Sequence, residues 1–150
     1  MAWYVYYWDP MKKSPMIAVF LAVALTMAAL PLRGERGAAT ITVRVVGDAK
    51  GFRFEPASIT AHVGDVVRFV NVSGGPHNVA FRADRIPDGA AATLEKNMGE
   101  TMGPLSGAMI FEPNARYTVS LAGLPAGTYN YYCVPHQAMN MTGRIKVRPR

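Results

Sequence analysis

Cysteine is scarce in this chain, which has one, Cys133, among its 150 residues. A single cysteine cannot form a disulfide within the chain, and it cannot complete a zinc site built from four cysteines or from two cysteines and two histidines. It also excludes a binuclear copper centre bridged by two thiolates. Cys133 can therefore be a buried side chain, a nucleophile or one ligand of a mixed metal site.

Charge is also sparse, since only 17% of the residues are Asp, Glu, Lys or Arg. Residues 40–150 hold 12 Lys and Arg against 8 Asp and Glu, a formal charge of +4. The positive residues are scattered, apart from a period-two series typical of a solvated strand face: Arg144, Lys146, Arg148 and Arg150. No basic cluster interleaved with aromatics is present, so the chain is not expected to bind nucleic acid. For a protein partner, scattered charge predicts mainly apolar docking with weak salt dependence.

The first 39 residues differ from the rest. Lys12 and Lys13 precede residues 14–32, which carry no charge and are mostly apolar. A charged start followed by an apolar stretch is the pattern of an export signal. The stretch also comes close to the roughly 20 residues that span a bilayer, so residues 1–39 are expected to be a signal peptide or an uncleaved membrane anchor.

Small residues end this segment and predict signal cleavage after Ala39. Met11 is a second candidate start, because it would place the two lysines at the opening of the segment. Residues 40–150 are then an exported domain, periplasmic or otherwise extracytoplasmic, with a membrane tether if the segment is not removed.

The 14 glycines and 11 prolines suit short strands joined by tight turns. Alternating or short apolar runs predict strands at 40–46, 58–63, 66–72, 77–81, 117–121, 128–133 and 143–147. The Gly64-Asp65 turn predicts that the second and third of these form a hairpin. A short helix is expected at 90–97 and a surface loop at 98–108. The chain is therefore expected to fold as an all-β sandwich with one core.

Metal-ligating side chains occur at two places. His77 stands where a strand restarts after a turn, and Cys133, His136 and Met141 share one loop between two predicted strands. His77 alone would be a turn histidine and Cys133 alone a small buried side chain. Together, two imidazoles, one thiolate and one thioether make the donor set of a blue copper electron-transfer site.

Several motifs carry a family resemblance: Gly75-Pro76-His77-Asn78-Val79, Ile86-Pro87-Asp88-Gly89, Gly127-Thr128-Tyr129, and Tyr132-Cys133-Val134-Pro135-His136-Gln137 with Met141 and Gly143. Over residues 41–148 the chain resembles the cupredoxins, the type 1 blue copper family, and among them plastocyanin. The resemblance implies a Greek-key β-sandwich of about seven to eight strands. It also implies one copper ion with His77, Cys133 and His136 as equatorial ligands and Met141 as the axial ligand.

The same resemblance implies roles for residues around the site. Asn78 would brace the thiolate and the ligand loop by hydrogen bonding. The edge of His136 would exchange electrons within an apolar patch that consists of Pro135, Met139, Gly74 and Gly75. Tyr132 would mark a second, more remote exchange surface. Two departures stand out: the acidic run of plant plastocyanins is missing, and the segment 95–111 is longer and richer in methionine.

The sequence thus predicts a blue copper protein that shuttles single electrons between redox proteins by Cu(II)/Cu(I) cycling. It is expected to be a monomer that docks transiently, and not an enzyme. Two alternatives remain open. One is an exported copper carrier or chaperone. The other is a nucleophilic enzyme with a Cys-His pair, which would leave Met141 without a role and lacks a third, orienting residue.

Overall fold

Two β-sheets form the domain in the computed structural model, which describes residues 1–3 and 37–150. The first sheet has the order β2 (Gly51–Glu55), β1 (Thr40–Asp48), β4 (Val66–Asn71), β8 (Arg116–Ser120). The second has the order β3 (Ser58–His62), β10 (Thr142–Arg148), β9 (Gly127–Tyr132), β5 (Ala80–Phe81), β7 (Ser106–Gly107), β6 (Thr101–Gly103). The described residues also form three short helices: η1 (Ala83–Arg85), α2 (Ala91–Asn97) and η2 (Gln137–Met139). The predicted all-β sandwich is confirmed.

Aromatic side chains fill the space between the sheets. Phe54 from β2, Phe69 from β4 and Tyr131 from β9 meet edge to face, with ring centroids 4.8 to 6.0 Å apart. All three are at most 2% exposed, and edge-to-face pairs of this kind stabilise a core beyond their buried area. Alternation along each strand brings one aromatic ring from each into the same layer. This core supports the end of the sandwich at which the predicted ligands lie.

The predicted hairpin of the second and third strands is wrong. β3 pairs parallel with β10 in one sheet, whereas β4 pairs parallel with β1 in the other. Gly64 has a φ of +89°, and the buried Asp65 carboxylate accepts the backbone N–H of His62 at 2.8 Å and of Ala39 at 3.0 Å. The turn therefore carries the chain across the sandwich between sheets, as Greek-key connections do.

Other elements agree with or extend the sequence analysis. The helix expected at 90–97 is confirmed as α2. The loop expected at 98–108 instead contains β6 and β7, which extend the second sheet beyond β5. The strand β2 was not predicted, although Phe52 and Phe54 alternate along it. These additions bring the strand count of the described residues to ten.

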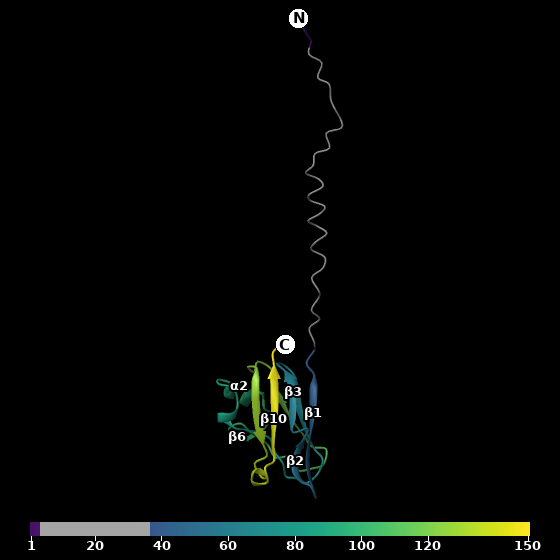
Figure 1. The fold of residues 1–150 in the computed structure, drawn as a ribbon, viewed down its shortest axis with the longest axis vertical. Helices are drawn as coiled ribbons and strands as arrows, with labels where there is room; N and C mark the ends of the chain where they lie inside the picture. The colour runs from purple at the N-terminus through teal and green to yellow at the C-terminus, as the bar shows by residue number, and fades with distance from the viewer. Residues whose placement is uncertain (4–36) are drawn as a thin grey trace. The chain divides into compact units, whose positions relative to one another are not determined.

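The loop between β9 and β10, which carries three of the predicted ligands, lies at the end of the domain opposite the C-terminus (Figure 1). Most of the predicted export segment, residues 4–36, lies outside the described residues. Within 1–3 and 37–150, no helix is long and apolar enough to cross a membrane.

Candidate metal centre

Three predicted ligands meet in one buried cluster. His77 is paired with Ile110 in an isolated bridge, Cys133 directly follows β9, and His136 precedes η2. The Cys133 Sγ lies 3.4 Å from His136 Nδ1 and 3.8 Å from His77 Nδ1. The three donor atoms all lie within 4.8 Å of one another, and no side chain of the three is more than 7% exposed. A single metal ion fits such a set.

The orientation of His77 is fixed by the preceding turn. Its Nε2 donates a hydrogen bond to the Ser73 carbonyl at 3.0 Å, so this nitrogen carries the hydrogen and Nδ1 keeps its lone pair towards Cys133. The same carbonyl accepts the Gly47 N–H at 2.9 Å. Gly74 makes this approach possible, because its φ is +74° and a Cβ there would meet the Gly47 backbone at 2.5 Å. The glycine thus holds the turn that orients the imidazole.

The ligand loop closes on itself through backbone hydrogen bonds. Cys133 N–H donates to the Met141 carbonyl at 3.1 Å, and Met141 N–H donates to the His136 carbonyl at 3.3 Å. Asn140 adopts a left-handed conformation with φ 58°, which turns the chain back after η2. Met141 is consequently fully buried, whereas Met139 is 55% exposed. The five-residue offset from His136 returns a thioether to the interior, and the three-residue offset does not.

Asn78 connects the histidine strand to the ligand loop. Its Oδ1 accepts the backbone N–H of Val134 at 2.8 Å, and its Nδ2 donates to the Gly107 carbonyl and to Ser106 Oγ, both at 3.2 Å. Its Nδ2 also lies 3.8 Å from the Met102 sulfur. The unpredicted strand pair β6–β7 therefore supplies the partners that hold Asn78 in place. The bracing role that the family resemblance implied for Asn78 stays a prediction, and these hydrogen bonds are the contacts through which it would act.

Phe52 is a site residue that the sequence analysis missed. Its ring stacks on His136, with centroids 3.7 Å apart and planes 11° from parallel, and meets His77 edge on at 6.0 Å. Phe52 belongs to β2 in the opposite sheet, so the contact joins the two layers over the ligands. The alternation of Phe52 and Phe54 was the available signal for the strand, but nothing in the sequence indicated its partner.

Burial sets the protonation of the three donors. It lowers the pKa of His77, only partly offset by the bond to Ser73, and it lowers the pKa of His136, with a further contribution from nearby His77. Both imidazoles thus favour the neutral form that binds metals. Burial also raises the pKa of Cys133, against opposing backbone hydrogen bonds from Asn78 and His136. A neutral thiol is a poor nucleophile, and it becomes a thiolate when it binds a metal.

Comparison with known proteins agrees with this geometry. The family of copper binding proteins described as plastocyanin/azurin matches residues 41–148. The chain belongs to this plastocyanin/azurin family. It is 35% identical over 132 residues to the chloroplastic plastocyanin of Chlamydomonas reinhardtii, covering 88% of this chain and 81% of that protein. It is 34% identical over 108 residues to the plastocyanin of Scenedesmus fuscus, covering 72% of this chain and 99% of that protein.

A solved structure gives the same result for the fold. The oxidised plastocyanin of Dryopteris crassirhizoma superposes with a TM-score of 0.55 and 32% identity, covering 72% of this chain and all of that one. The protein is a blue copper electron-transfer protein, as the sequence predicted, and its cofactor is copper. The donor set fits this metal, because thiolate suits Cu(I) and imidazole serves Cu(II) as well.

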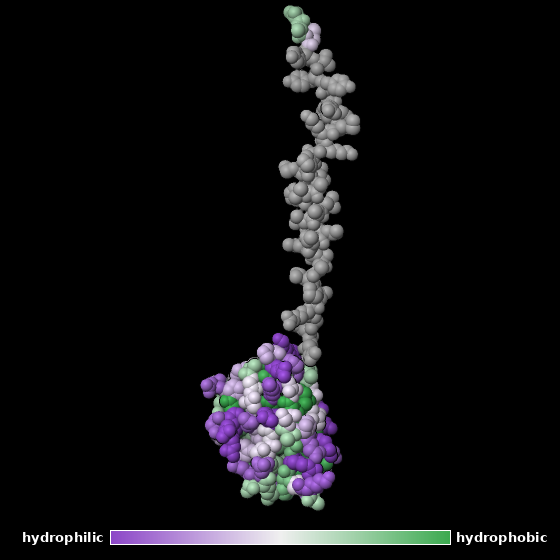
Figure 2. Space-filling view, viewed as in Figure 1, coloured by the Kyte–Doolittle hydropathy of each residue, from purple (hydrophilic) through white to green (hydrophobic). Residues whose placement is uncertain are grey.

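The surface over this cupredoxin site is largely apolar and uncharged. Pro135, Gly74 and Gly75 are exposed, as is Met139, and Phe111 adds a ring that is 63% exposed. Figure 2 shows pale and green residues at this end of the domain, between more hydrophilic flanks. His136 itself is only 7% exposed, because Phe52 covers one face of its ring. Any electron exchange through His136 is confined to a narrow edge.

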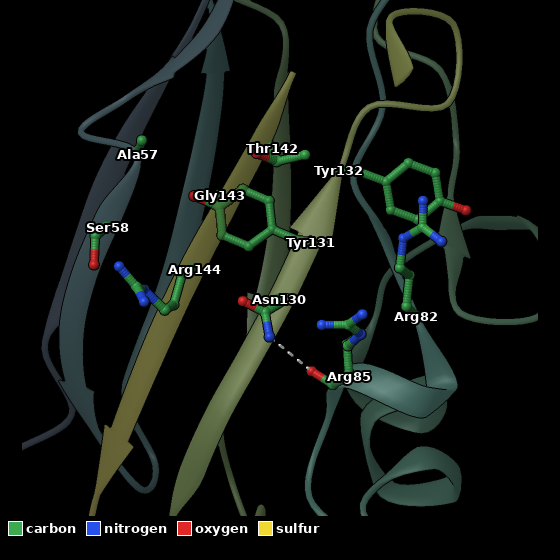
Figure 3. Close-up of a pocket in the computed structure, with 10 residues that line it drawn as sticks. All are labelled: Ala57, Ser58, Arg82, Arg85, Asn130, Tyr131, Tyr132, Thr142, Gly143 and Arg144. Atoms are coloured by element: carbon green, nitrogen blue, oxygen red, sulfur yellow. Dashed lines mark hydrogen bonds between the residues drawn. The ribbon is translucent and has the colours of Figure 1, made fainter. Parts of the chain in front are cut away.

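Tyr132 lies elsewhere, on the outer surface of the second sheet. It borders a shallow depression that is also lined by Arg82, Arg85 and Arg144 (Figure 3). Positive residues from separate parts of the sequence therefore gather on this face. Arg82 and Arg85 are three residues apart in sequence, whereas Arg144 is far from both, and the register of β9 and β10 brings it into the same depression.

Proposed function

We propose that His77, Cys133 and His136 are the equatorial ligands of the copper ion and that Met141 is the axial ligand. On this proposal the protein carries single electrons between two redox proteins and catalyses no reaction of its own. The observation that carries it is the convergence of two imidazole nitrogens and one thiol sulfur within 4.8 Å in a buried pocket of neutral groups.

Copper, when bound, supplies the one-electron Cu(II)/Cu(I) couple. The chain's own residues keep the donors in one arrangement for both states. Ser73 holds the His77 ring, Asn78 holds the start of the ligand loop, and Phe52 packs on His136. A donor set that cannot rearrange keeps the energetic cost of cycling low.

The nucleophilic alternative is disfavoured by the electrostatics of the cluster. A catalytic cysteine needs an easily formed thiolate in a partly exposed, electropositive setting. Cys133 is fully buried, its pKa is raised, and both neighbouring imidazoles favour the neutral form. A copper carrier would use the same soft ligands, so the spectroscopic test described below distinguishes it from an electron carrier.

We further propose that the domain acts outside the cytoplasm as a monomer that docks transiently, after export directed by residues 1–39. Hydrogen bonding supports a domain start close to the predicted cleavage point. The Ala39 carbonyl accepts a hydrogen bond from the Val66 N–H at 2.8 Å, and the Ala39 N–H donates a hydrogen bond to the Asp65 carboxylate. Cleavage after Ala39 would remove both bonds, so sequencing the mature N-terminus tests whether processing occurs there or slightly earlier.

The visible spectrum of the purified chain with one equivalent of Cu(II) tests the proposal. We expect an intense thiolate-to-copper charge-transfer band that a mild reductant bleaches and an oxidant restores. Cys133→Ser should abolish the band, whereas His62→Ala, in β3, should leave it unchanged. A colourless complex would refute the assignment, and tight Cu(I) binding without reversible colour would favour the carrier.

A further inference from the structure

The outer face of the second sheet is basic. Along β10, Arg144, Lys146 and Arg148 are all exposed. The register places Arg144 between Ser58 and Asn130, and it places the next two cations beside Thr60, Thr128 and His62. No carboxylate occurs in β3, β9 or β10. The three cations therefore face solvent beside strands that offer them no counter-charge.

The basic character continues across β9 towards the metal centre. Arg82, Arg85 and Arg144 line an open depression of about 410 Å³ together with Tyr132. The Arg82 guanidinium lies over the Tyr132 ring at 4.9 Å, a cation–π contact that supplies no negative counter-charge (Figure 3). Among residues 37–150, the ion pairs include Arg85 with its neighbour Asp84 at 3.4 Å but none to Arg82 or Arg144.

Tyr132 links this depression to the buried site. It is covalently bonded to Cys133, and its half-buried ring lies on the outer face while the Cys133 side chain is fully enclosed. A molecule seated against Tyr132 therefore contacts the residue next to the thiolate. By contrast, Phe52 covers one face of the His136 ring and leaves only its edge for contact with a partner. The basic face thus offers a second route for electrons, with its own charge.

We propose that this face, defined by Arg82, Arg85, Arg144, Lys146 and Arg148 around Tyr132, binds the acidic surface of a redox protein that exchanges one electron with the copper site. The proposal rests on the proposed function. In the exchange the reduced partner loses one electron and becomes oxidised, Cu(II) becomes Cu(I), and no bond forms or breaks. The reverse direction balances in the same way.

The shape of the basic face favours a protein over a small anion. From Arg144 to Arg148 the strand rises about 13 Å, and the arginines beyond β9 widen the strip by roughly another 10 Å. The depression is open rather than enclosed, so it would leave most of a small ion in water. Spread positive charges on an exposed sheet face, of which only Arg85 is paired with a carboxylate, are the complement of a negatively charged protein face. Such charges accelerate association at low ionic strength, in contrast to the weak salt dependence expected from scattered charge.

Stopped-flow oxidation of two cytochromes tests the proposal. The Cu(II)-loaded chain is mixed with a reduced acidic c-type cytochrome or with a reduced basic one, at low and at physiological salt. We expect the acidic cytochrome to react at least about tenfold faster at low salt and to lose most of that advantage at physiological salt. Arg144→Glu should slow this reaction severalfold, whereas Arg116→Glu, an equal charge change at an exposed site in the other sheet, should not.

A second variant separates docking from electron exchange. Tyr132→Leu should lower the limiting rate with the acidic cytochrome while leaving the concentration for half-saturation nearly unchanged, and Arg144→Glu should do the opposite. Equal effects of Arg144→Glu and Arg116→Glu, or faster reaction with the basic cytochrome, would overturn the proposal. So would binding of phosphatidylserine vesicles that Arg144→Glu abolishes with the cytochrome rates unchanged. The blue band is recorded first, because its absence refutes the proposed function, whereas normal colour with charge-independent rates refutes only this docking surface.

Discussion

Removing the Asn78 side chain should destabilise the domain more than any other single hydrogen-bonding change near the site. In Asn78→Ala, the Val134 N–H loses its 2.8 Å acceptor, and the Gly107 carbonyl and Ser106 hydroxyl lose their donor. Asn78 is fully buried, so water cannot replace it without entering the core. An unsatisfied buried polar group costs about 1–3 kcal/mol, and the loss of these partners together with a small cavity gives roughly 2–5 kcal/mol.

Thermal unfolding of the copper-free chain, followed by circular dichroism, measures this cost without a contribution from metal binding. A loss of this size should lower Tm by about 10–20 °C in a domain of about 100 residues. Ser106→Ala is the matched control, because it removes one partner of Asn78 and should cost only about 0.5–1.5 kcal/mol. If Asn78→Ala were no more destabilising than Ser106→Ala, Asn78 would not brace the ligand loop.

Three further predictions concern the ligand loop, its cover and the opposite end of the domain. Met141→Leu should keep the blue band and raise the reduction potential measured by voltammetry, because loss of a weak donor disfavours Cu(II), whereas Met141→Gln should lower that potential. Met139→Leu should change neither the band nor the potential. An effect of Met139→Leu without one of the Met141 variants would contradict the axial assignment. Phe52→Leu should weaken copper binding about tenfold in chelator competition, since the stack on His136 is lost, whereas Phe52→Tyr should bind like wild type. Burial alone would raise the pKa of Asp65, but the hydrogen bonds from the N–H groups of His62 and Ala39 lower this pKa overall. The ionised Asp65 therefore stabilises the fold fully above the unfolded-state pKa of about 3.9, and this stabilisation is lost as pH falls through the lower folded-state pKa. Asp65→Asn should therefore cost about 1–3 kcal/mol in urea unfolding at pH 7 and progressively less below about pH 4; a difference that stays constant through acid would refute this reasoning.

The convergence of Cys133 and His136 could be predicted from the sequence because the information is local, and the axial role of Met141 stays a prediction. Cys133, His136 and Met141 share one short loop, so their spacing alone limits how they can converge. The crossing at Gly64-Asp65 could not be predicted in the same way, since a tight turn within one sheet and a turn between sheets use the same residues. Only the pairing of β3 with β10 and of β4 with β1 distinguishes the two.

The basic face and the cover over His136 depend on contacts between distant parts of the chain. Arg82 and Arg144 come to line one depression through strand register, which a linear charge pattern does not contain. Phe52 meets His136 because β2 lies in the opposite sheet, and the strand alternation that places Phe54 in the core says nothing about which ring Phe52 will touch. The sequence therefore predicted the chemistry of the site better than its surroundings.

The stack of Phe52 on His136 has a consequence for engineering. Transplanting residues 133–141 into another cupredoxin scaffold would move three proposed ligands and leave behind the ring that confines one of them, because Phe52 belongs to a strand of the other sheet. Asn78 and its β7 partners would also stay behind. The ligand loop is thus not an independent module, and a graft that reproduces this site has to include the β1–β2 hairpin as well.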